Sequence, residues 1–229
     1  MKKRIVQAIG VICLSSVIFV APYGADDNTK TSTEPIEEIT FELKEKPLFE
    51  CPQEETVEEI NIVEEKTLEA QEKISKINTD DKLEWFKEYK KIQDEYSEWV
   101  DKDETIYDYF NEEELSLLFK IVETEVRGDK CFEEKVNVTN VILNRIKHDD
   151  FPKCIIDVLT QYPQFSSYTS GAYKKVEVTE TTILACEYAF QFNDTTDGAL
   201  YFDSTNRKSW AEKNRVYIFT DSVGHSFYK

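Results

Sequence analysis

The chain has 229 residues and a formal net charge of −18 at neutral pH, and apolar residues make up 40% of it. This length permits one large or two small domains. Because nucleic-acid binding depends on basic side chains that neutralise phosphates, the acidic balance argues against DNA or RNA as a partner.

Charge is distributed unevenly along the chain. Residues 1–21 have a balance of +3, and residues 22–104 have a balance of −15, with 11 basic and 26 acidic groups. Residues 105–229 have a balance of only −6 and contain most of the Phe and Tyr residues. About 125 residues are enough to form an independent core. We therefore expect one folded domain at 105–229, preceded by an extended acidic region.

The N-terminus has the pattern of an export segment. Residues 2–4 are basic and precede an uncharged apolar run of 17 residues, 5–21. We expect residues 1–25 to be a signal peptide or an N-terminal membrane anchor. The run is slightly short for a spanning helix, and Tyr23 is too large for the −3 position of cleavage after Ala25. The positive-inside rule then places everything after residue 25 outside the cell, in the medium, in the wall or anchored to the membrane.

Two regions separate this segment from the C-terminal half. Residues 26–57 are rich in Thr, Glu and Pro and predict an acidic disordered spacer. Residues 58–104 have a helical pattern whose apolar positions recur at three- and four-residue steps: Phe86, Tyr89, Ile92, Tyr96, Trp99 and Val100. We interpret this stripe as a face packed on its own domain rather than as a peptidoglycan-binding or coiled-coil surface.

An amphipathic helix opens the C-terminal half. Its apolar stripe consists of Leu115, Leu118 and Val122, and Glu125 falls next on that stripe. Residues 111–114 form a capping-box pattern, and Gly128 is a natural helix stop, so Glu125 is expected in the last turn. There the helix dipole and partial burial would both disfavour ionisation of the carboxyl group, as in a general acid.

Later elements are predicted from periodicity and residue type. Helices are expected at about 131–147 and 179–192, and strands at 199–203 and 215–220, which are rich in Tyr, Phe, Ile and Val. Helices followed by a small sheet indicate an α+β fold.

A series of short motifs runs in order through this half. They are Glu125-Val-Arg-Gly-Asp129, Val138–Arg145 with its Leu-Asn-Arg ending, Phe151-Pro152, Gln164-Phe-Ser166, Gly198–Phe202, Trp210 and Gly224–Tyr228. The series resembles that of the spore cortex-lytic, or SleB/CwlJ-type, cell wall hydrolases, where the first motif is Glu-Ala-Arg-Gly-Glu. The resemblance implies a lysozyme-like or lytic-transglycosylase-like domain whose substrate is the glycan strand of peptidoglycan.

The resemblance implies that Glu125 is the catalytic acid. Cleaving a glycosidic bond requires a carboxylic acid that protonates the leaving oxygen, and a muramidase-type hydrolase needs a second carboxylate as well. The candidates for that second group are Asp129, Asp197 and Asp203. A lytic transglycosylase needs only one Glu, because the C6 hydroxyl of the substrate attacks and gives a 1,6-anhydro-muramic product. We favour this single-acid mechanism.

Four other residues are candidates for substrate binding. Gln164 and Ser166 could bind sugar hydroxyl or acetamido groups, or could stabilise their loop. Tyr201 could orient Glu125 or contact the glycan, or belong to the core, and Trp210 could stack on a sugar ring or cover the core. Beside the proposed acid, Thr124 and Glu123 depart from the family pattern, which has Gly and an apolar or aromatic residue there.

The cysteines and histidines of the chain allow other classes of protein to be considered. Cys131, Cys154 and Cys186 permit at most one disulfide within the domain. A Cys–His peptidase would pair Cys154 or Cys131 with His148 or His225, but no flanking motif supports it. His225 is expected to be structural or to line the cleft; no metal site and no cofactor are expected. A non-catalytic glycan-binding protein and a structural surface protein with an acidic stalk are the alternatives to an enzyme.

Overall fold

The structure, a computed structural model, describes residues 57–100, 103–161, 165–203 and 209–229. The predicted signal or anchor segment, all but the last residue of the predicted spacer, and Gln164 lie outside these ranges. Within them, no helix combines the length and the apolar character needed to cross a bilayer.

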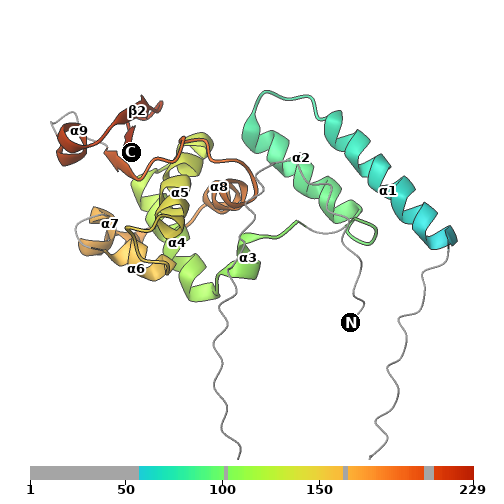
Figure 1. Cartoon of the computed structure of the whole chain (residues 1–229), viewed down its shortest axis with the longest axis horizontal. Coiled ribbons are helices and arrows are strands. Elements are labelled where there is room, and N and C mark those ends of the chain that lie inside the picture. The colour runs from blue at the N-terminus through green and yellow to red at the C-terminus, as the bar shows by residue number, and fades with distance from the viewer. Residues whose placement is uncertain (1–56, 101–102, 162–164, 204–208) are drawn as a thin grey trace, which may run out of the picture. The chain divides into compact units, whose positions relative to one another are not determined.

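Two helices precede the C-terminal half: α1, Val57–Ser75, and α2, Lys82–Glu95 (Figure 1). Phe86 and Tyr89 on α2 are buried in a cluster formed with residues of α5, Phe132–Lys147, and α8, Glu180–Gln191. Ile92 and Tyr96 are buried against α1. The interpretation of the aromatic stripe as a packed face is therefore confirmed for these four side chains.

The helix that carries Glu125 forms as predicted. After the short α3, Ile106–Tyr109, helix α4 spans Glu112–Glu125. In its capping box, the Asn111 side chain accepts from the Glu114 N–H at 3.1 Å, and the Glu114 carboxylate accepts from the Asn111 N–H at 2.9 Å. Gly128 has a φ of +107°, a conformation that favours glycine, so the chain turns away soon after Glu125.

Helix α5 forms the centre of the C-terminal half. All its residues from 134 to 143 are buried, which is expected of a helix surrounded by other elements. It packs against α8, α4, α2 and α6, Ile155–Thr160. The short helices α7, Ser166–Thr169, and η1, Ala172–Lys175, connect α6 to α8. Both long helices, predicted at 131–147 and 179–192, are confirmed.

A small antiparallel sheet completes the domain. Its strand order is β1, Tyr201–Asp203; β3, Ser226–Tyr228; and β2, Tyr217–Thr220. Helix α9, Trp210–Asn214, lies between β1 and β2 in sequence. Phe227 of β3 is buried with Val141 of α5, so the sheet is attached to the central helix. The predicted strands are confirmed in shorter form, the central strand β3 was not predicted, and the fold class is α+β as expected.

Candidate active site

Glu125 is the last residue of α4 and is partly buried. Its Oε1 atom is inaccessible to solvent and has no hydrogen-bond partner within the described part of the chain. Buried polar atoms are nearly always paired in folded proteins, so each exception needs an explanation. Glu125 as a residue is only partly buried, so its carboxyl group can approach a bound substrate, and no described protein group competes for Oε1.

Glu123 is the most deeply buried acidic residue of α4, with 5% of its surface exposed. It accepts hydrogen bonds from Lys135 Nζ at 2.9 Å, from Thr179 Oγ1 at 2.8 Å and from Thr182 Oγ1. Burial alone would raise the pKa of Glu123, but these hydrogen bonds outweigh burial and hold the pKa below its usual value. Glu123 therefore stays ionised and fastens α4 to α5 and α8. This explains its departure from the family pattern as a structural ion pair.

The segment that follows the predicted Gln-Phe-Ser loop lies against the helix that carries Glu125. Phe165 is buried in the same cluster as Val122 and Val126, and α7 and η1 both contact α4. Tyr168 and Tyr173 stack within this segment, with ring centroids 5.2 Å apart. Ser166, at the start of α7, is exposed.

Phe165 also connects this region to the sheet, because its ring centroid is 6.2 Å from that of Phe202 on β1. The next residue back along β1, Tyr201, lies between two guanidinium groups. Arg145 Cζ is 5.5 Å and Arg215 Cζ is 4.7 Å from the centre of its ring. Its hydroxyl accepts a hydrogen bond from Arg215 Nη2 at 3.1 Å. Among the described contacts, none joins Tyr201 to Glu125.

Trp210, the first residue of α9, extends this stack to the surface. Arg215 Cζ is 4.7 Å from the centre of its ring, and the Tyr201 ring centroid is 5.6 Å away. The residue is 57% exposed, so it does not cover the core. An exposed aromatic ring supported by a guanidinium group provides a flat surface of the kind on which sugar rings stack.

Arg145, on the last turn of α5, was not among the predicted site residues. It is 3% exposed, and its Nε donates to the Leu200 carbonyl oxygen at 2.7 Å. Its guanidinium group lies over the rings of Phe151 and Phe165, at 5.2 and 5.3 Å, as well as over Tyr201. Burial lowers the pKa of Arg145 to about 10, so it stays protonated at neutral pH. Arg145 therefore contacts residues of three other motif segments. The sequence signal that could have identified it is the Leu-Asn-Arg ending of its own motif.

His225 belongs to the turn between β2 and β3. It is 5% exposed, its Nδ1 lies 3.3 Å from Asp221 Oδ2, and its ring packs edge-on against Phe202 and Phe227. The described residues contain no cluster of three or more His, Cys, Asp or Glu side chains that could hold a metal ion.

The candidates for a second carboxylate are dispersed. Asp129 and Asp197 are exposed, and Asp197 lies 3.7 Å from Lys229 Nζ. Asp203, on β1, is opposite Ser226 in the sheet. No hydrogen bond or ion pair between described residues joins Glu125 to Asp129 or Asp197.

The three cysteines of the domain are free thiols. Cys186 is buried beside Thr139, and burial raises its pKa to about 12. Burial also raises the pKa of Cys131. A cysteine nucleophile needs an accessible thiolate, so neither thiol has the environment of a peptidase nucleophile. Cys154 is exposed, and no contact with a histidine is found for it in the described ranges.

Residues 129–228 match the family model described as Cell Wall Hydrolase. This match agrees with the family predicted from the motifs. The match begins at Asp129, four residues after Glu125. The role of Glu125 thus rests on the sequence motif and on its geometry.

Two solved structures are similar to this chain. One is the catalytic domain of the germination-specific lytic transglycosylase SleB from Bacillus anthracis, with 25% identity, a TM-score of 0.48, and coverage of 54% of this chain and 100% of that one. The other is the catalytic domain of the Bacillus cereus SleB protein, with 26% identity, a TM-score of 0.46, and coverage of 52% and 92%. No curated protein matches the chain.

Proposed function

We propose that this domain cleaves the glycan strands of peptidoglycan between N-acetylmuramic acid and N-acetylglucosamine, with Glu125 as the catalytic acid. The family match over residues 129–228 supports a wall polymer as the substrate. The observation that carries the role of Glu125 is its buried Oε1, which has no hydrogen-bond partner among the described residues. Glu125 as a residue is only partly buried, and none of the described residues donates to its Oε1, whereas the neighbouring carboxylate of Glu123 is held by three side chains.

The reaction that fits a single acid is a lytic transglycosylation. Glu125 donates its proton to the glycosidic oxygen as the bond to C1 of the muramic acid breaks. The resulting carboxylate then accepts the proton of the C6 hydroxyl while that oxygen bonds to C1. The products are a 1,6-anhydro-muramic end and a free N-acetylglucosamine end, and Glu125 regains its proton.

Contacts to the sugar rings are proposed for the tilted pair of aromatic rings Tyr201 and Trp210, together with Ser166 at the start of α7. Trp210 offers an exposed ring face, and Arg215, which follows α9, contacts both aromatic rings. Arg145 is a positioning residue, because it holds Tyr201 and Phe165 without being accessible itself.

The product of wall digestion tests this proposal. Purified peptidoglycan is incubated with the protein, and the soluble fragments are analysed by mass spectrometry. We expect anhydro-muropeptides from the wild type and none from Glu125→Gln, with unchanged circular dichroism. Glu113→Gln makes the same chemical change at an exposed position of α4 and should keep full activity. Reducing muropeptides would instead indicate a muramidase-type hydrolase, and the absence of any release by the wild type would indicate a glycan-binding protein.

We also propose that the protein is exported and acts outside the membrane, cleaved from its N-terminal segment or anchored by it. The basic residues 2–4 and the apolar run that follows support this proposal. Cell fractionation and N-terminal sequencing of the mature protein would distinguish a cleaved from a retained segment. Recovery of the full chain in the cytoplasm would contradict export.

A further inference from the structure

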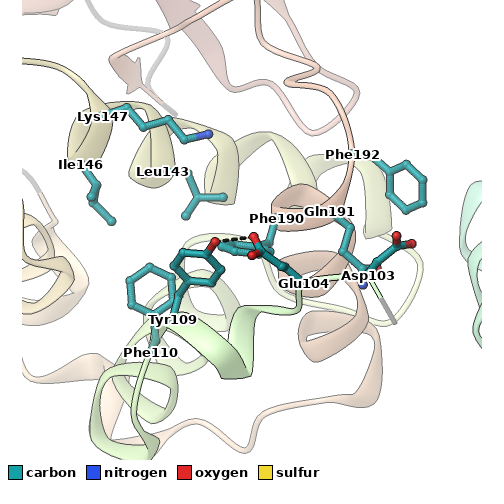
Figure 2. Close-up of a pocket in the computed structure, with 10 residues that line it drawn as sticks. All are labelled: Asp103, Glu104, Tyr109, Phe110, Leu143, Ile146, Lys147, Phe190, Gln191 and Phe192. Carbon is teal, nitrogen blue, oxygen red and sulfur yellow. Dashed lines mark hydrogen bonds between the residues drawn. The ribbon is translucent and has the colours of Figure 1, made fainter. Parts of the chain in front are cut away.

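A cavity of about 590 Å³ lies beside α3 and the C-terminal ends of α5 and α8 (Figure 2). Glu125 and the predicted sugar-binding residues are not among the residues that line it. A cavity of this size accommodates a small molecule or a side chain of a ligand. Its lining therefore describes a site separate from the proposed catalytic acid.

One side of this cavity is rich in hydrogen-bond acceptors. Asp103 and Glu104 contribute exposed carboxylates, and each accepts one hydrogen bond from a tyrosine, Tyr89 and Tyr109 respectively. A carboxylate can accept several hydrogen bonds, so both retain acceptor capacity. Gln191 contributes a buried Oε1 for which the described residues provide no donor. A ligand that complements Glu104 brings an N–H or O–H donor.

The wall between these acceptors and α5 is aromatic and apolar. The rings of Tyr109 and Phe190 have centroids 5.1 Å apart, and Phe110 meets Phe190 edge-on at 6.4 Å. Leu143 and Ile146 line the α5 side. Aromatic faces attract organic cations, and their combination with nearby carboxylates favours an ammonium group over a neutral hydroxyl.

Lys147 supplies the opposite charge. It extends over the cavity from the last residue of α5, while Glu104 approaches from the segment before α3 (Figure 2). Lys147 is exposed, and its ammonium group makes no ion pair with the residues that the structure describes. A cavity with a carboxylate on one side and, on the other, an ammonium group unpaired among the described residues matches a zwitterion with an apolar middle.

We propose that this cavity binds the terminal diamino acid of a peptidoglycan stem peptide. The side-chain ammonium group lies at Glu104, the carbon chain lies along Phe190, and the terminal carboxylate meets Lys147. The preference for an ammonium zwitterion follows from the cavity, and the choice of a stem peptide rests on the proposed function. Binding here would hold the peptide part of the wall while Glu125 acts on the glycan.

Direct binding tests this inference without relying on catalysis. The probe is the tripeptide L-Ala-γ-D-Glu-L-Lys, titrated into the full chain by calorimetry, with its Nε-acetyl derivative and its C-terminal amide as matched ligands. We expect the free tripeptide to bind and each modified ligand to bind about three- to tenfold more weakly, since each loses one charge interaction at an accessible site.

Variants locate the site. Glu104→Gln should weaken binding of the tripeptide about three- to fivefold, and Lys147→Met should abolish the difference between the acid and the amide. Tyr109→Leu should weaken binding, whereas Tyr109→Phe keeps the ring and should bind within about twofold of the wild type. Glu64→Gln, an exposed substitution on α1, is the control and should change nothing.

Equal binding of the acetylated and free tripeptides, or no binding of either, would overturn the inference. Loss of binding in Glu125→Gln but not in Glu104→Gln would place the peptide elsewhere. These outcomes are distinguishable from failure of the proposed function. Release of anhydro-muropeptides without tripeptide binding refutes only this site, and tripeptide binding without release refutes only the cleavage.

Discussion

The buried ion pair between Glu123 and Lys135 provides the sharpest test of how α4 is held. Lys135 is fully buried, and its ammonium group lies 2.9 Å from the Glu123 carboxylate. Lys135→Met leaves that carboxylate buried with only three donors, the hydroxyl groups of Thr179 and Thr182 and the N–H of Thr179. Removing one partner of a buried pair costs about 3–5 kcal/mol, so we expect a loss of that size in the free energy of unfolding.

The double variant Glu123→Leu/Lys135→Met tests whether the loss of stability comes from leaving one buried charge unpaired. Because both charges are removed together, it should recover most of the loss that the single variant shows. Urea denaturation followed by circular dichroism measures both values. A cost below about 1 kcal/mol for Lys135→Met, or a double variant less stable than the single one, would refute the reasoning.

The same pair predicts a dependence of stability on pH. The pKa of Glu123 is lower in the folded state than its ordinary value near 4.5. Its contribution to stability is therefore complete above the unfolded pKa and is lost as the pH falls through the folded pKa. The stability of the wild type relative to the double variant should therefore fall below about pH 4.5. An equal difference at pH 7 and pH 3 would contradict this assignment.

Three further predictions concern residues around the site. Trp210→Ala should reduce binding to insoluble peptidoglycan in a pull-down assay while leaving the melting temperature within a few degrees, because the ring is exposed. Arg145→Lys should lower the free energy of unfolding by about 2 kcal/mol, since an ammonium group cannot stack on three rings as a planar guanidinium does; unchanged urea unfolding would contradict this. Gly128→Ala should lower the free energy of unfolding by about 1 kcal/mol, because the φ of Gly128 is positive although there is space for a Cβ atom. A more stable variant would be evidence against this backbone strain.

Local signals in the sequence were sufficient for most of the helices. The capping box at Asn111 and the stop at Gly128 act within a few residues, so α4 was predicted almost to its ends. The central strand β3 was missed because it is three residues long and is defined by pairing with β1 and β2, which are distant in sequence. A short strand carries little pattern of its own.

The sequence by itself determined the family, the α+β class and the position of Glu125 at the end of a helix, because these depend on motifs and on short-range periodicity. Only the tertiary structure decided how the two neighbouring carboxyl groups differ. The apolar periodicity placed Glu125 on the buried face of α4. In the structure, however, Glu123 is the carboxylate that is held in the interior, where it accepts hydrogen bonds from Lys135 and Thr179. Those partners lie 12 and 56 residues further along the chain, and folding alone brings them to α4. Glu125 retains a buried oxygen that has no partner in the described residues, and this difference is the basis of its proposed role as the acid.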